Sequence, residues 1–297
     1  MADRASGGDG AAGEPSPAET TRVWTSRLAA FLPDFMERHP AYRHTVRRAD
    51  VIFQGSTTFG VDDDHSDLDL SVLMTDEDLA AFDSVSGTRY IDFELGGKPG
   101  SLKAEPAAEL SARVDRCDMP LIAELRPAVV MLHGLGTAED LIARARRPMR
   151  DEVRRAFFFL HYFEMRSYHR SADNPMERGD AVAAYLSTAE ALAHALRASM
   201  GLHGEPYPYE KWLYRFAIAT PTGAALVSHV DALLGHLAAD GLRLKGPERD
   251  NPISQEMRAI RAILIEAAHA GGIDEPWLTR WWLFINQARA ATRDVVW

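Results

Sequence analysis

The stretch VIFQGSTTFGVDDDHSDLDLSVLM restricts the fold of this chain more than any other feature. In it, a polar motif lies between two apolar segments. The first apolar segment predicts a buried strand, and Gly55-Ser56 follows it directly. The second segment predicts another strand, with Asp67 at its start and Asp69 inside it. Because side chains alternate across a strand, both carboxylates point to one side while their leucine neighbours point to the core.

These residue types favour a site for a divalent cation and phosphate. Two carboxylates on one face repel each other unless a cation lies between them. Mg2+ is typically held by one or two carboxylates together with substrate phosphates. Glycine lets the backbone approach a ligand closely, and free N–H groups at a turn favour phosphate. We therefore expect Gly55, Ser56 and Thr57 to bind phosphate and the pair Asp67 and Asp69 to bind metal.

Gly55-Ser56, a short spacer and the pair Asp67 and Asp69 between apolar residues resemble the signature of the DNA polymerase beta-like nucleotidyltransferase superfamily. This superfamily includes the aminoglycoside and lincosamide nucleotidyltransferases, and the likeness covers residues 51–95. It implies an enzyme that moves a nucleoside monophosphate, with ATP as the expected donor, onto the hydroxyl of a small-molecule acceptor and releases pyrophosphate. It also implies two Mg2+ ions that clamp the attacking and leaving oxygens.

The superfamily has a third carboxylate on a later strand, and residues 89–95 match that place. In this segment Asp92 and Glu94 share one face, and three apolar residues share the other. The resemblance assigns the third ligand to Asp92, with Glu94 as the alternative, and we expect the carboxylates to converge from two neighbouring strands. Asp67 and Asp69 would bind the metal that holds the triphosphate, and Asp69 and Asp92 the metal at the acceptor hydroxyl. The general base stays open between Asp92 and an acid of the later helices.

The chain as a whole predicts two domains preceded by a tail. Residues 1–20 contain almost no large apolar residue and predict a disordered tail. Residues 21–135 predict an α+β nucleotidyltransferase domain with a small mixed sheet flanked by helices. From residue 136 to residue 297 helical patterns follow one another, which predicts an all-α helical bundle. Within the first domain we expect a helix from Thr21 to His39, a turn or loop at Gly96–Gly100 and a helix from Pro106 to Val114.

A basic pair in the helical region is a further candidate for phosphate binding. Lys211 and Arg215 lie four residues apart on a helix expected from Tyr209 to Ile218, so they share a face. The segment resembles a lysine-tryptophan element of some antibiotic nucleotidyltransferases, which implies that both side chains meet the triphosphate. The alternative is a surface pair with Trp212 in the core.

Composition limits the kinds of molecule that this protein is expected to bind. The formal net charge of −10 argues against a broad nucleic-acid footprint, which is normally basic, and favours a small or cationic acceptor. The single cysteine, Cys117, excludes a disulfide within the chain, and no apolar run has the length of a transmembrane helix. We therefore expect a cytoplasmic protein with no membrane partner. Two alternatives stay open, namely nucleotidylation of a partner protein and nucleotide binding without turnover.

Overall fold

The computed structural model describes residues 16–43, 45–240 and 251–297, and the chain divides into two compact units. Unit 1 comprises Met1–Leu110 and Pro127–Ile142, and unit 2 comprises Ser111–Arg126 and Ala143–Trp297. The chain therefore passes between the units more than once, whereas the sequence led us to expect a single passage after residue 135.

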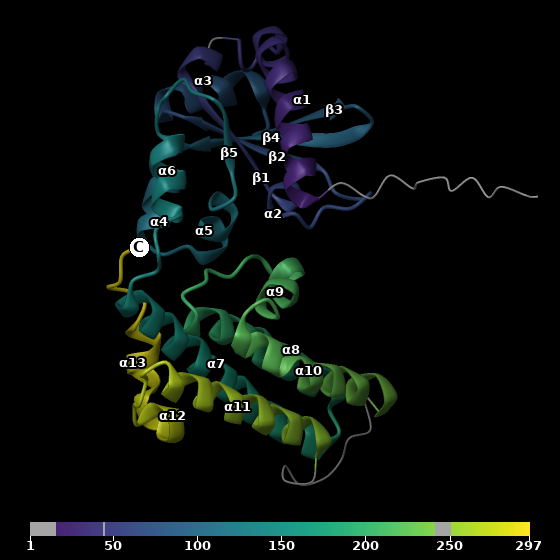
Figure 1. The fold of residues 1–297 in the computed structure, drawn as a ribbon, viewed down its shortest axis with the longest axis vertical. Coiled ribbons are helices and arrows are strands. Elements are labelled where there is room, and N and C mark those ends of the chain that lie inside the picture. The colour runs from purple at the N-terminus through teal and green to yellow at the C-terminus, as the bar shows by residue number, and fades with distance from the viewer. Residues whose placement is uncertain (1–15, 44, 241–250) are drawn as a thin grey trace, which may run out of the picture. The chain divides into compact units, whose positions relative to one another are not determined.

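Unit 1 is built on a five-stranded mixed sheet in the order β3-β4-β2-β1-β5 (Figure 1). The β2–β4 pair is parallel, and the other three pairs are antiparallel. This sheet, followed by a largely helical second unit, confirms the α+β class predicted from the sequence. The strands are β1 (Asp50–Gln54), β2 (Leu68–Met74), β3 (Tyr90–Leu95), β4 (Lys98–Pro106) and β5 (Val129–Leu132).

One face of the sheet is apolar and packs on α1 (Pro17–Arg38). Leu68 and Leu70 of β2 point to this face because they alternate with the acidic residues of the motif. They are buried together with Leu28 and Leu32 of α1, which lie one helical turn apart. The opposite face is therefore free to carry the polar residues of the motif. The other helices with residues in this unit are α2 (Ser56–Phe59), α3 (Asp76–Ser86), α4 (Ala107–Asp115) and α6 (Ala138–Ala145).

The first helix begins earlier than the sequence suggested. The Ser16 hydroxyl accepts the Glu19 N–H at 3.3 Å, and the Glu19 carboxylate accepts the Ser16 N–H at 3.4 Å. This reciprocal capping box, with Pro17 at the first helical position, starts the helix. The expected tail of residues 1–20 is therefore wrong for residues 17–20, while residues 1–15 lie outside the described residues.

Strand β4 replaces most of the turn or loop expected at Gly96–Gly100. Only Gly96 and Gly97 form the turn, with φ angles of 61° and 81°, and the chain then returns as a strand. Local propensity does not predict β4, because its first residues include proline and glycine, which are unfavourable in strands. Gly100 has a packing reason, because a Cβ there would lie 2.3 Å from the ring of Phe93. The helix expected from Pro106 to Val114 is α4, shifted by one residue.

Asp50 of β1 holds the start of α6 in place. Its Oδ1 accepts the N–H groups of residues 134–136 at 2.8–3.0 Å, and its Oδ2 accepts those of Thr137 and Ala138 at 2.7 and 2.8 Å. The side chain is fully buried. Burial alone would raise the pKa of Asp50, but the backbone bonds from residues 135–138 outweigh it and lower the pKa. The carboxylate thus satisfies the donors that the first turn of a helix leaves unpaired.

Unit 2 is a helical bundle, with α7, α8, α10 and α11 side by side in Figure 1. Its core contains Phe158 and Tyr162 of α7, Ala195 of α8, Leu233 of α10 and Leu264 of α11, all buried. The helices are α5 (Met119–Leu125), α7 (Asp151–Arg178), α8 (Ala181–Leu202), α9 (Glu210–Ala217), α10 (Pro221–Asp240), α11 (Pro252–Ala270), α12 (Trp277–Arg280) and α13 (Ile285–Ala290).

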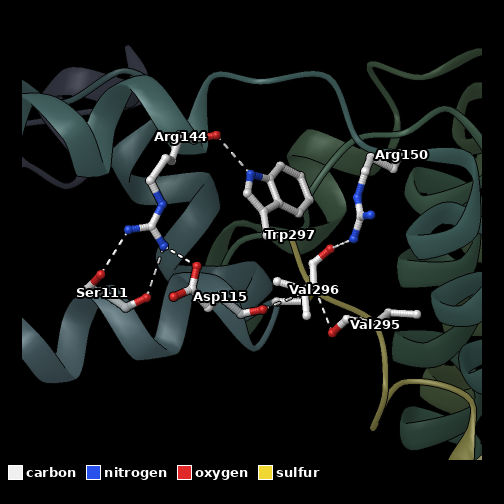
Figure 2. Close-up of polar contacts among 8 residues, drawn as sticks. Ser111, Asp115, Arg144, Arg150, Val295, Val296 and Trp297 are labelled. Carbon is white, nitrogen blue, oxygen red and sulfur yellow. Dashed lines mark hydrogen bonds and ion pairs between the residues drawn. The ribbon is translucent and has the colours of Figure 1, made fainter.

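The last residues of the chain are tied to two earlier segments of unit 2 (Figure 2). The Trp297 indole N–H donates to the carbonyl of Arg144 at 2.9 Å, and its backbone N–H donates to the carbonyl of Asp115 at 3.2 Å. The Arg144 guanidinium also pairs with the Asp115 carboxylate, and Arg150 donates to the carbonyl of Val296. These contacts join residues 111–126 to the bundle although they are distant in sequence.

None of the described helices is, on its own, both long and apolar enough to cross a membrane. One pair, Glu210–Ala217 with Pro221–Ala238, meets the length and composition criteria only jointly and is bent by 111°.

Candidate active site

The two halves of the sequence motif touch in the structure. β1 ends where its antiparallel partner β2 begins, so Gln54 lies opposite Asp69. The next residue, Gly55, has a φ of 88°, and a Cβ at this position would lie 2.4 Å from Oδ2 of Asp69. A residue with a side chain would need both an unfavourable backbone conformation and displacement of the carboxylate. Glycine is thus required here because the backbone turns directly against the Asp69 side chain.

The residues after Gly55 form a single helical turn. Ser56 begins α2, and the turn is closed by the N–H of Val61, which donates to the Ser56 carbonyl at 3.0 Å. In a helix the first N–H groups have no partner within the helix, so those of Ser56 and Thr57 are donors for an anion. The Thr57 hydroxyl is buried and has no hydrogen-bond partner within residues 16–43, 45–240 and 251–297. Any contact of Thr57 with phosphate would therefore come from its backbone N–H.

The sheet register places the acidic residues on one face but not on adjacent strands. Asp69 of β2 lies opposite Ser101 of β4, and Ser101 lies opposite Asp92 of β3. Glu94 is displaced from Asp92 by two residues along β3, opposite Pro99. The expectation that the carboxylates come from two neighbouring strands is wrong, because β4 lies between β2 and β3. Two strand spacings separate the Asp69 and Asp92 backbones by about 10 Å.

The residues fit one metal ion bound together with a triphosphate better than a metal held by protein alone. Asp67 is exposed and precedes β2, and Asp69 is half-buried beside Gly55. Among the described residues, no three His, Cys, Asp or Glu side chains are grouped so that they could hold a metal ion. Mg2+ does not need such a group, because it takes one or two carboxylates and completes its shell with phosphates and water. The roles of Asp92 and Glu94 as third ligand stay predictions.

A polar network that sequence reasoning missed lies on the same face. The Gln54 amide donates to the Ser71 hydroxyl at 3.1 Å, and this hydroxyl donates to Glu105 at 2.7 Å. Lys103 forms an ion pair with Glu105 at 2.8 Å. The signal was present in β4, where Ser101, Lys103 and Glu105 alternate with apolar residues, but it becomes visible only once this segment is known to be a strand.

The acidic loop before β2 is partly held by its own hydrogen bonds. Oδ1 of Asp63 accepts the Ser66 hydroxyl at 2.9 Å and the His65 N–H at 3.0 Å. These bonds, the one from Ser66 first, lower the pKa of Asp63. Asp62 forms an ion pair with Lys98 at 3.2 Å. Both side chains thus contribute to the shape of the loop that precedes Asp67.

The predicted basic pair lies in unit 2. Lys211 and Arg215 are exposed on α9, one helical turn apart. Leu213 of the same helix is buried, and Trp212 is half-buried with its ring 5.6 Å from the Lys211 ammonium. The pair therefore lies on the solvent side of α9. Its contact with nucleotide phosphates stays a prediction.

Comparison with known proteins finds similarity only among solved structures. No protein-family model matches the chain, and no curated protein sequence matches it. A solved nucleotidyltransferase-like protein from Exiguobacterium sibiricum 255-15 is similar over 92% of this chain and 82% of its own length, at 16% sequence identity and a TM-score of 0.48. A similarity at this level does not identify an activity.

Proposed function

We propose that this protein is a nucleotidyltransferase that moves the monophosphate of a nucleoside triphosphate, with ATP as the expected donor, onto the hydroxyl of a small-molecule acceptor. The acceptor oxygen attacks the α-phosphorus, and the bond from that phosphorus to the pyrophosphate oxygen breaks. The hydroxyl proton passes to a carboxylate, for which Asp92 is the candidate, and pyrophosphate leaves. Positioning and charge neutralisation supply most of the rate gain in such a transfer.

The observation that carries this proposal is the contact between Gly55 and the Asp69 carboxylate. It brings together the Gly-Ser turn and the Asp-x-Asp pair, which are separated in sequence, at the edge of the sheet where β1 ends and β2 begins. A turn with free N–H groups beside two carboxylates suits a triphosphate and its cation. This combination is what the resemblance to the DNA polymerase beta-like superfamily implies.

Each of the candidate site residues has a role in the proposed reaction. The backbone N–H groups at Ser56 and Thr57 would bind the β and γ phosphates, with the Ser56 hydroxyl as a further donor. Asp67 and Asp69 would hold Mg2+, which when bound neutralises the triphosphate and polarises the reacting phosphorus. Asp92 of β3, with Glu94 as the alternative, would supply the third carboxylate. Lys211 and Arg215 are proposed to add positive charge at the phosphates.

The decisive test is transfer by the purified full chain. Reactions with Mg-ATP and pooled aminoglycosides and lincosamides are analysed for released pyrophosphate and for an acceptor that has gained AMP. We expect wild-type protein to produce both and Asp69→Asn to lower the rate by about 10³-fold or more, because an aligned charge on the metal is lost. Asp231→Asn, an exposed acid of α10, is the matched control and should keep the wild-type rate.

Three results would revise the proposal in different ways. Wild-type rates in Asp69→Asn would show that the assigned roles are wrong. AMP attached to a polypeptide in a cell lysate, with no small-molecule product, would favour the partner-protein alternative. Tight binding of Mg-ATP with no product in any mixture would favour a nucleotide-binding protein without turnover.

A further inference from the structure

Three helix ends in unit 2 enclose a groove that has no part in the proposed transfer. α8 ends at its rim, α10 begins there, and the last turns of α11 form its third side. Its volume is about 540 Å³, which lies within the range of roughly 300–1,000 Å³ typical of small-molecule sites. Every lining residue belongs to unit 2.

The groove is open because its walls carry small side chains. Ala225 of α10 and Ala267 and Ala270 of α11 stand where longer side chains would fill the space. Leu202 and Ile263 form an apolar wall between them. An apolar body of a few carbon atoms could therefore leave water here without a change in the helices.

A neutral histidine presents a hydrogen-bond donor at this site. The backbone N–H of Thr222 donates to Nε2 of His203 at 3.2 Å, and the Thr222 hydroxyl oxygen lies 2.8 Å from the same nitrogen. A ring nitrogen that accepts an N–H bond is unprotonated, so the neutral ring carries its proton on Nδ1. Burial is the main cause that lowers the pKa of His203, which keeps the ring uncharged at neutral pH.

An acid gives the groove a negative end. Glu266 is exposed, and no cation pairs with it within the described part of the chain. It lies close to the C-terminus of the 19-residue helix α11. Arg154 at the rim donates to the carbonyls of Leu202 and Gly271, each at 3.4 Å, but its charge is paired with Asp151 at 2.9 Å. Arg155 shares this acid at 2.7 Å and donates to the carbonyl of Gly272, so the rim carries an excess positive charge, while Glu266 makes the lining of the groove itself negative.

We propose that this groove binds a small amphiphilic cation. The apolar body packs on Leu202 and Ile263, the ammonium group pairs with Glu266, and His203 donates to an acceptor on the ligand where one is present. The site is built from residues of unit 2 alone, so it is independent of the carboxylates of unit 1.

Calorimetric titration of the full chain with phenethylammonium at pH 7 tests this proposal, with 2-phenylethanol and phenylacetate as neutral and anionic counterparts. We expect phenethylammonium to bind most tightly. Glu266→Gln should weaken it about tenfold, close to 1.4 kcal/mol, and leave 2-phenylethanol unchanged. Ala225→Phe, at an exposed position of the wall, should abolish binding, and Asp231→Asn on the same helix should have no effect.

Several outcomes would overturn the proposal. These are no binding of phenethylammonium up to about 10 mM, equal binding of phenylacetate, or unchanged affinity in Glu266→Gln. Binding that persists in folded Ala225→Phe would place the ligand elsewhere on the molecule. Circular dichroism of each variant separates lost binding from lost fold.

Discussion

At the scale of single residues, Asp50 shows how one side chain can fix a distant element. Its carboxylate accepts five backbone N–H bonds at the start of α6, and it is fully buried. Sequence reasoning assigned Asp50 no role, because an acid next to an apolar run gives no sign of which helix it caps. Gly55 is the opposite case, since the motif alone indicated its place beside Asp69.

Replacement of Asp50 by Asn should destabilise the fold. The amide can accept fewer of the five bonds and brings two donors into a site full of donors, so we expect the free energy of unfolding at pH 7 to fall by about 2–4 kcal/mol. The pKa of Asp50 is lowered in the folded state, so its contribution is present above its ordinary value of about 3.9 and is lost as pH falls through the lowered value. Urea denaturation of both proteins at pH 7 and pH 3.5 checks this, and a gap that does not narrow at the lower pH would contradict it.

At the scale of elements, the helices of unit 2 hold three neutral histidines, of which His161 and His169 are buried and His194 is half-buried. His161 of α7 and His194 of α8 face each other with their Nδ1 atoms 2.9 Å apart, and His169 contacts Ser254 of α11 at 3.2 Å. Burial lowers the pKa of all three, to about 4 for His194 and about 3 for His169, with nearby arginines adding to the effect. Protonation of these rings therefore opposes folding.

The expected consequence is a loss of stability in mild acid. Below the ordinary histidine pKa of about 6.5 the unfolded chain binds protons that the folded chain does not, so stability falls by up to about 4 kcal/mol per pH unit for three such groups. Unfolding free energies at pH 7, 6 and 5 measure this slope. The His161→Gln and His194→Gln double variant should have a shallower slope, and an unchanged slope would contradict the assignment.

The sheet also marks where sequence reasoning stops at this scale. β1, β2 and β3 follow from runs of apolar residues and their alternation, and the structure has a strand at each of these three places. β4 does not follow, because its first residues include Pro99 and Gly100. The pairing partner of β2 depends on long-range contacts that the local sequence pattern does not encode. In the structure β4 lies between β2 and β3, so Asp92 is one strand further from Asp69 than expected.

At the scale of the whole molecule, the α+β class and the helical character of the second half were readable from periodicity. The path of the chain between units was not. Residues 111–126 belong to unit 2, where Arg144 and Trp297 bind them through Asp115. Contacts between such distant segments depend on tertiary packing, and no local pattern in the sequence predicts them.

We propose above all that Gly55, Ser56 and the Asp67–Asp69 pair form a site for a nucleotide with its cation. Calorimetric titration of the full chain with ATP, in the presence and absence of Mg2+, measures this without knowledge of the acceptor. We predict binding that requires Mg2+ and that weakens at least about tenfold in Asp69→Asn. Equal affinity for Mg-ATP in wild type and Asp69→Asn, or no binding by the wild-type protein, would contradict it.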